Sequence, residues 1–255
     1  MEEFLRSTDA ECDDVSRIVA RVYAQKLVPV DFTEFAYASL PLAVIDAPWS
    51  VGVGYTTVRN VVGRFVTVTG WKLFAPSREE RGEGDRRLGE LLDVLQRQSD
   101  EANAAQLFQN RQRTSTAARG ILKAEAVRLL AERLCEHGIE TFRDALVGVG
   151  GRYRADYQRV PGQGGVSLSY FRMLIGDDDV IKGDRQVLGW LHDALGRKVS
   201  QRQAEALLPM AAKVLQQQDR RWTARFLDGA IWERQRAKSG SHPAFSGKIC
   251  SGWAC

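Results

Sequence analysis

The sequence lacks the long apolar run that would cross a lipid bilayer. No stretch of its 255 residues approaches the roughly 20 consecutive apolar residues that a membrane helix requires. The first residues, MEEFLRSTD, also lack the basic segment followed by an apolar one that marks an export signal. We therefore expect a cytoplasmic protein that has no membrane partner.

Patterns typical of metal and nucleotide sites are missing as well. The four cysteines, Cys12, Cys135, Cys250 and Cys255, show no metal-site spacing such as Cys-x2-Cys. Neither the GxGxxG pattern of dinucleotide-binding folds nor the phosphate-binding GxxxxGK[ST] loop occurs. The acidic run at 177–179 is interpreted as a solvated loop, because no further ligands cluster in the sequence around it. We therefore expect no metal site and no nucleotide-binding sheet.

The charge that is present is unevenly distributed. Residues 1–100 carry 12 Lys/Arg and 16 Asp/Glu, a net charge of −4, whereas residues 101–255 carry 24 and 16, a net charge of +8. A basic half beside an acidic half favours one face that meets a polyanion. A solvated charged surface would explain the same distribution, so the charge alone does not decide between the two.

Apolar residues recur at helical spacing along most of the chain, and a composition of 44% hydrophobic and 27% charged residues is typical of a globular protein. The pattern predicts an all-α fold with short connections and no parallel sheet. The tail 238–255, rich in Gly and Ser, is expected to fray. The predicted helices span 9–24, 35–44, 57–65, 86–98, 101–109, 117–136, 139–146, 152–159, 166–175, 185–195, 200–217 and 220–237.

A glycine-rich turn separates two of these predicted helices. Residues 161–165 read PGQGG, and the second helix begins near Val166. Glycines allow positive φ and leave backbone N–H groups uncovered. The N-terminus of a helix adds unpaired N–H groups and a favourable dipole for a phosphate. Such a turn can hold a DNA backbone without recognising its sequence.

This segment resembles the hairpin of the helix-hairpin-helix DNA glycosylases, the endonuclease III superfamily. Their hairpin has the form LPGxG, and residues 160–164 read VPGQG. Asp184 follows Pro161 by 23 residues, the separation between the hairpin proline and the catalytic aspartate in endonuclease III. Upstream, GILKAEA at 120–126 is similar to the family's GxxxKA segment, and LPLAVI at 40–45 is similar to its early helix pair.

The resemblance implies an architecture and a set of site residues. It implies two all-α domains with the active-site cleft between them: a helical domain at 33–183 that ends in the helix-hairpin-helix, and a second one formed by 1–32 and 184–255. Asp184 would be the catalytic residue. The implied DNA-binding residues are Gly162, Gln163, Gly164, Gly165, Val166, Arg111, Arg113 and Lys182, and the base pocket would include Trp49 and Tyr55.

Two departures from the family limit the chemistry that we expect. Bifunctional members carry a nucleophilic lysine two residues after the second hairpin glycine, where this chain has Val166. Water is then the expected nucleophile, and lyase activity is not expected. Endonuclease III also holds an iron–sulfur cluster with four cysteines, of which Cys250 and Cys255 would supply only two. We therefore expect no cofactor, although the hairpin could hold a monovalent cation.

These features predict a monofunctional DNA glycosylase. As a monomer on double-stranded DNA, it would flip out a damaged or modified base, hydrolyse the N-glycosidic bond and leave an abasic site. The carboxylate of Asp184 would stabilise the oxocarbenium-like sugar and orient or deprotonate the attacking water. The same enzyme could act in antiviral defence, on hypermodified bases of phage DNA, instead of in DNA repair. A non-catalytic helix-hairpin-helix DNA-binding protein is a third hypothesis.

Several of the proposed site residues also have purely structural interpretations. Aspartate is a favourable N-cap, so Asp184 could simply cap a helix. Trp49 and Tyr55 could belong to the core, and Arg111 and Arg113 to a solvated loop. The segment LVGVG at 146–150 is a competing hairpin candidate that lacks the proline.

Overall fold

The computed structural model describes residues 2–30, 36–77, 80–81, 86–98, 101–148 and 153–238. Over these ranges the chain is helical, with two isolated β-bridges, Tyr37–Phe74 and Arg113–Leu122, as its only extended pairing. The predicted all-α fold is therefore confirmed for this part of the chain. None of the helices in these ranges combines the length and apolar character that a membrane span needs.

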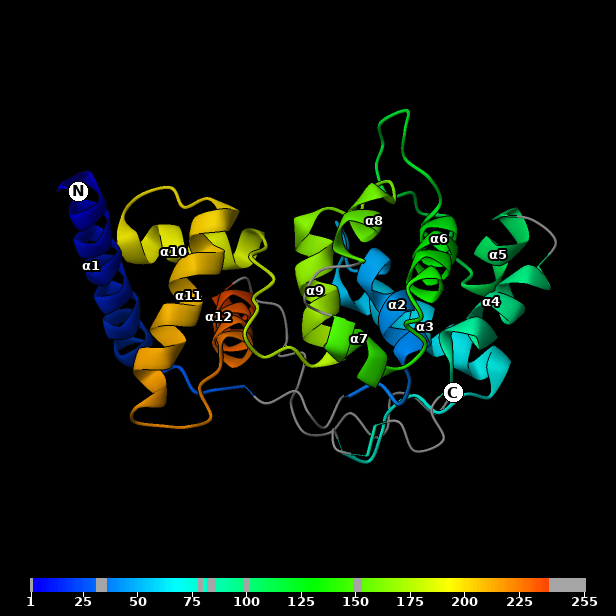
Figure 1. Cartoon of the computed structure of the whole chain (residues 1–255), viewed down its shortest axis with the longest axis horizontal. Helices are drawn as coiled ribbons and strands as arrows, with labels where there is room; N and C mark the ends of the chain where they lie inside the picture. The colour runs from blue at the N-terminus through cyan, green and yellow to red at the C-terminus, as the bar shows by residue number, and fades with distance from the viewer. Residues whose placement is uncertain are drawn as a thin grey trace. The chain divides into compact units, whose positions relative to one another are not determined.

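The chain divides into two compact units. Unit 1 consists of Met1–Asp31 and Asp178–Cys255, and unit 2 of Phe32–Asp177. The helices of unit 1 are α1 (Glu2–Ala24), α10 (Arg185–Leu195), α11 (Gln201–Gln216) and α12 (Ala224–Lys238) (Figure 1). The helices of unit 2 are α2 (Leu40–Trp49), α3 (Tyr55–Thr69), α4 (Leu88–Gln96), α5 (Glu101–Leu107), α6 (Lys123–Glu136), α7 (Phe142–Gly148), α8 (Arg154–Arg159) and α9 (Gly165–Ile175).

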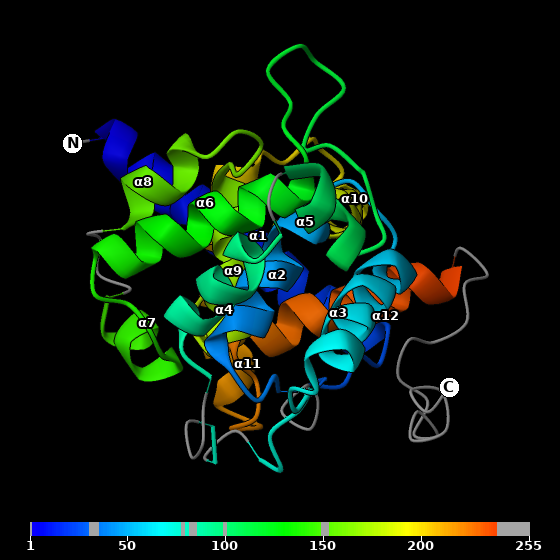
Figure 2. The same cartoon turned by 90° about the vertical axis from the view of Figure 1, so that its right-hand side faces the viewer.

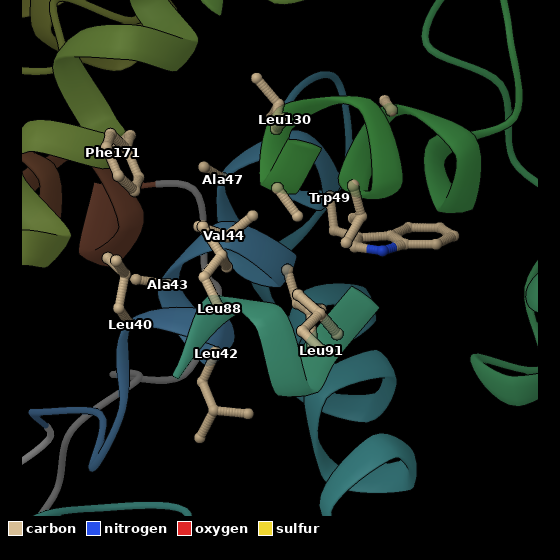
Figure 3. Close-up of a cluster of buried hydrophobic side chains, with 14 of the residues drawn as sticks. Leu40, Leu42, Ala43, Val44, Ala47, Trp49, Leu88, Leu91, Leu130 and Phe171 are labelled. Carbon is tan, nitrogen blue, oxygen red and sulfur yellow. The ribbon is translucent and has the colours of Figure 1, made fainter. Parts of the chain in front are cut away.

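Helix α2 lies at the centre of unit 2. All ten of its residues are buried, and all but Asp46 are apolar, as expected of a helix in the interior of a domain. It packs against α3, α4, α6 and α9. Figure 3 shows Val44 and Ala47 of α2 among Leu88 of α4, Leu130 of α6 and Phe171 of α9. Helices α6 and α9 thus pack on this core, and α9 follows the segment expected to form the hairpin.

Two helices begin five or six residues later than predicted. The helix predicted at 35–44 is observed as α2, where Pro41 lies in the first turn, a position at which proline favours helix initiation. The helix predicted at 117–136 begins only at Lys123, because the preceding residues form a loop that is closed by backbone hydrogen bonds. Periodicity located both helices, and proline and loop closure determined where they begin.

Unit 1 is built from four amphipathic helices. Helix α1 packs against α10 and α11, and α12 packs against α10 and α11. Ile18, Trp190, Leu208 and Leu227 contribute fully buried side chains to a shared core. The indole N–H of Trp190 donates to Oε1 of Gln25 at 2.9 Å, which satisfies the polar atom of this buried ring.

Candidate functional site

The segment expected to form the hairpin connects α8 to α9 in unit 2. The amide of Gln163 donates to the carbonyl of Val160 at 2.9 Å and closes a turn around Pro161 and Gly162. Gly162 has a φ of +82°. Proline followed by a glycine with positive φ is typical of a type II turn. Gly164 then serves as the N-cap of α9.

Gly162 and Gly164, two of the three glycines in this segment, have different roles. A Cβ on Gly162 would lie 2.4 Å from Cβ of Thr114, so both space and φ require glycine there. Gly164 has a φ of −77°, and a Cβ placed on it would meet nothing within 4 Å. The fold therefore does not need glycine at this second position. Its bare backbone leaves the first-turn amides of α9, which include Gly165 and Val166, open to approach by an anion.

Gln163, which was expected among the DNA-binding residues, is buried in unit 2. Its side chain is 1% exposed, and its Oε1 accepts from the hydroxyl of Ser167 at 2.6 Å. The Oγ of Ser167 lies 3.1 Å from the hydroxyl of Tyr157. The structure thus places the side-chain oxygen of Gln163 inside the hairpin, where it ties the turn to α9.

A loop projects from unit 2 between α5 and α6 (Figures 1 and 2). Its two sides are joined by the bridge between Arg113 and Leu122 and by the amide of Thr114, which donates to the carbonyl of Ile121 at 2.8 Å. The guanidinium of Arg113 donates to the carbonyl of Gly120, at 3.1 Å from Nε. Arg113, expected as a phosphate contact, therefore also closes the loop.

The outer part of this loop is basic. Arg111 and Arg119 are exposed, and the sequence has no Asp or Glu between 106 and 124. Because Gly162 lies against Thr114 at the base of the loop, loop and hairpin are neighbours within unit 2. Arg111 was expected to contact phosphate, and Arg119 is a second exposed arginine of this loop that could do so. The absence of acidic residues over this stretch of sequence was the signal for it.

Asp184 begins α10 in unit 1 as its N-cap, with extended backbone. Its Oδ1 accepts from the amides of Gln186 at 2.8 Å and Val187 at 3.3 Å. Within the described part of the chain no hydrogen bond reaches Oδ2, and the side chain is partly exposed. One carboxylate oxygen is thus fixed by the helix and the other can meet water or a ligand, so capping and catalysis are compatible at this residue.

A second carboxylate, which the sequence analysis missed, lies near Asp184. Asp228 of α12 is 5% exposed, and its Oδ1 accepts from the amide of Lys182 at 3.1 Å. Burial and the charge of Asp184 raise the pKa of Asp228 to about 7, while hydrogen bonds from the Lys182 and Gly183 amides oppose the rise. The one acidic residue in the apolar stretch 227–231, LDGAI, was the available signal.

The two aromatic residues expected in a base pocket occupy different environments. Trp49 has no exposed surface, and its ring centroid lies 5.8 Å from that of Phe108. Lys123 donates to the carbonyls of Trp49 at 3.2 Å and Val51 at 2.7 Å, and burial lowers the pKa of its ammonium to about 8. The expectation for Trp49 is corrected, because its ring fills the core at the end of α2. Tyr55, at the start of α3, is partly exposed.

Tyr55 lies near Tyr37, whose hydroxyl binds a buried aspartate that the sequence did not single out. Asp46 of α2 accepts from the hydroxyl of Tyr37 at 2.7 Å and from that of Tyr170 at 3.4 Å. Burial, with the charge of Asp46, raises the pKa of Tyr37 well above its ordinary value, and Tyr55 and Tyr170 contribute in the same direction. Tyr55 and Tyr170 are partly exposed, so the cluster includes both buried and accessible phenols.

The remaining candidate residues lie in unit 1, in α7 or outside the described residues. Lys182 is partly exposed and precedes Asp184 in unit 1. In the competing hairpin, residues 146–148 belong to α7, and 149–150 lie outside the described residues. Cys250 and Cys255 also lie outside them. Among the residues that can be described, no group of three or more His, Cys, Asp or Glu side chains is placed to hold a metal ion.

Comparison with known proteins identifies a family but no function. The profile of a domain of unknown function, DUF8548, matches residues 14–236. The match spans nearly all described residues of both units, including the hairpin, Asp184 and Asp228. No curated protein matches the chain.

Proposed function

The chain belongs to DUF8548, a family of unknown function, and we propose that it is a monofunctional DNA glycosylase acting on double-stranded DNA. The observation that carries the proposal is Asp184. It is a helix-capping aspartate with one oxygen held by two amides and the other open. It follows by 23 residues the proline of a turn that joins α8 to the amide end of α9.

The hairpin supplies the DNA-binding part of the proposal. The first-turn amides of α9 would bind one phosphate, with Gly164 leaving room for its approach. Arg111 on the adjoining loop would contact a neighbouring phosphate. Since such contacts are made to the backbone, they would position the protein on DNA without selecting a sequence.

The carboxylate supplies the chemistry. Base flipping costs a few kcal/mol of stacking and pairing, and it exposes the glycosidic bond to the enzyme. As the base leaves, positive charge develops on the sugar, and the carboxylate of Asp184 would stabilise this charge. Its open Oδ2 could also accept a proton from the attacking water. No amine replaces water at Val166, so the product would be an intact abasic site.

The tyrosines around Asp46 support a place for the flipped base in unit 2. Tyr55 and Tyr170 keep exposed surface, on which a base can stack. The hydroxyl of Tyr170, which donates to Asp46, could in turn accept a hydrogen bond from a base N–H through its oxygen. Tyr55 and Tyr170 would therefore stack on the base, since the ring of Trp49 is buried in the core.

An excision assay tests the proposed function. Duplex DNAs, each carrying one damaged or hypermodified base, are incubated with the full chain and then treated with alkali. We expect alkali-dependent strand breaks for at least one substrate and no breaks without alkali. Borohydride should trap no covalent adduct, because no Schiff base forms. Release of damaged bases would indicate repair, and release of hypermodified bases would indicate defence. DNA binding without excision of any base would favour the non-catalytic hypothesis.

A further inference from the structure

The segment that leads into Asp184 is attached to α12. The amide of Arg225 donates to the carbonyl of Asp178 at 3.1 Å, and the guanidinium of Arg225 lies 3.5 Å from Oδ1 of Asp178. One turn further along α12, Oδ1 of Asp228 accepts from the amide of Lys182 at 3.1 Å. Helix α12 thus holds the segment at its beginning and again immediately before Asp184.

Between that second attachment and Asp184 lies a single residue, Gly183. Its φ of +56° belongs to the left-handed region, and a Cβ on it would lie 3.2 Å from Cγ of Gln201. The backbone therefore turns sharply after Lys182 and enters α10 one residue later. A shift of the Lys182 amide would be passed almost directly to the Asp184 carboxylate.

We infer that Asp228 is a positioning residue, which holds the Lys182–Gly183 backbone and thereby sets the placement of the Asp184 carboxylate. This inference rests on the proposed function only for its effect on catalysis. Asp228 is too deeply buried to touch DNA, so it acts through Asp184. The buried carboxyl group supplies an acceptor for the backbone N–H of Lys182.

The nearness of the two carboxyl groups strengthens the argument. The charge of Asp184 and the buried site both favour the protonated form of Asp228. At neutral pH Asp228 can therefore act as a hydrogen-bond acceptor for Lys182 without placing a full second negative charge beside Asp184. The arrangement keeps the negative charge on the partly exposed carboxylate, where the proposed chemistry needs it.

Three variants of the full chain test the inference. Asp228→Leu removes the acceptor, and Asp228→Asn retains an oxygen that can accept from Lys182. Ile231→Ala removes packing from the same helix and leaves the hydrogen bonds of Arg225 and Asp228 to the segment in place. Amide hydrogen exchange by NMR would follow Lys182, Gln186 and Val187. Single-turnover excision and the Kd for the same duplex would be measured on the substrate that the wild type cleaves.

We expect Asp228→Leu to lose at least tenfold protection at Lys182 and to disturb the Gln186 and Val187 amides. Its excision rate should fall ~10- to 100-fold, because a shift of about 1 Å can have that effect. Its Kd should stay within threefold of wild type. Asp228→Asn should retain the rate to within about threefold, a rescue that loss of packing would not show. Ile231→Ala should keep both the rate per folded molecule and the protection of Lys182.

The inference is overturned if Asp228→Leu keeps wild-type protection at these amides, or if Ile231→Ala disturbs them equally. If Asp228→Leu does not fold, Asp228→Ala, which adds no bulk, decides by the same measurements. If the wild type excises no base, the exchange data still decide whether Asp228 places Asp184. The proposed function would then fail while the positioning role is judged separately.

Discussion

The two units carry different kinds of chemical group among their candidate functional residues. Unit 2 offers backbone amides, which the hairpin exposes at the start of α9. Unit 1 offers carboxylates, one partly exposed at the start of α10 and one buried in α12. The first kind depends on the course of the main chain and on the absence of side chains, and the second depends on single side-chain oxygens.

This difference separates binding from chemistry in a way that substitutions can test. In unit 2, a side chain that replaces the hydrogen of Gly164 should obstruct a phosphate and leave the fold intact. In unit 1, exchange of one oxygen of Asp184 for an NH2 group should leave the shape intact and remove the charge. In a glycosylase, the change at Gly164 should weaken DNA binding and the change at Asp184 should abolish base excision. In a DNA-binding protein without catalysis, only the change at Gly164 should have an effect.

The largest expected effect is that of Asp184→Asn. Asparagine is also a good N-cap, so α10 and the stability of unit 1 should change little. The negative charge that would stabilise the sugar cation is lost, and the excision rate should fall at least ~100-fold. Single-turnover excision and a DNA-binding titration on the same duplex measure the two properties. Unchanged excision would assign catalysis to another residue.

A pair of glycine substitutions should give the next largest effects. Gly162→Ala forces a side chain into a positive φ and against Thr114, and it should destabilise the fold by ~1–3 kcal/mol. Gly164→Val meets open space, so its free energy of unfolding should change by at most about 1 kcal/mol, through weaker capping. Its DNA affinity should nevertheless fall about tenfold through lost charge-assisted hydrogen bonds. Denaturant unfolding and a binding titration check the pair, and unchanged binding by Gly164→Val would exclude this turn as a DNA contact.

The contrast between these glycines was only partly predictable from the sequence. The PGQGG composition predicted a turn before a helix, which was correct for 161–165. It could not tell which glycine is required for the fold, because the neighbour of Gly162 is Thr114, 48 residues earlier in the chain. It also gave no sign that the hydroxyl of Ser167, one helical turn later, binds the side-chain oxygen of Gln163 inside the hairpin.

The same limit applies to the buried acidic residues. Helical periodicity predicted the all-α fold, but it treats an aspartate within an apolar helix as an exception without a partner. Asp46 and Asp228 find their partners in other segments, in the tyrosine hydroxyls and in the Lys182 amide. The N-cap position of Asp184 could be predicted because capping is a local property of the sequence. Where the structure pairs distant segments, the sequence can flag the buried acidic residue but does not identify its partner.

The buried carboxyl of unit 1 should make stability depend on pH. The pKa of Asp228 is raised from 3.8 to about 7 in the folded chain, so the folded state holds this proton more tightly than the unfolded state. The associated stabilisation is complete below about pH 4 and is lost as the pH rises to about 7, by at most ~1.4 kcal/mol per pH unit. Asp228→Asn should remove this slope. Urea unfolding of both proteins between pH 4 and 8 measures it, and parallel curves would show that the proton is not bound there.

The smallest effect should come from the basic loop of unit 2. Arg111 and Arg119 are exposed beside the hairpin, whereas Arg133 of α6 is paired with Glu136 at 2.9 Å. Each phosphate contact should contribute about 0.9 to the slope of log K against log[salt]. Arg111→Gln and Arg119→Gln should therefore each lower the slope by nearly one, with a few-fold loss of affinity at moderate salt. Arg133→Gln, the matched control, should leave the slope unchanged, because its charge is already paired and it lies outside the loop. Equal losses in all three variants would mean that DNA responds to the net charge of the chain and not to this loop. The hairpin amides would then be the remaining candidates for phosphate binding in unit 2.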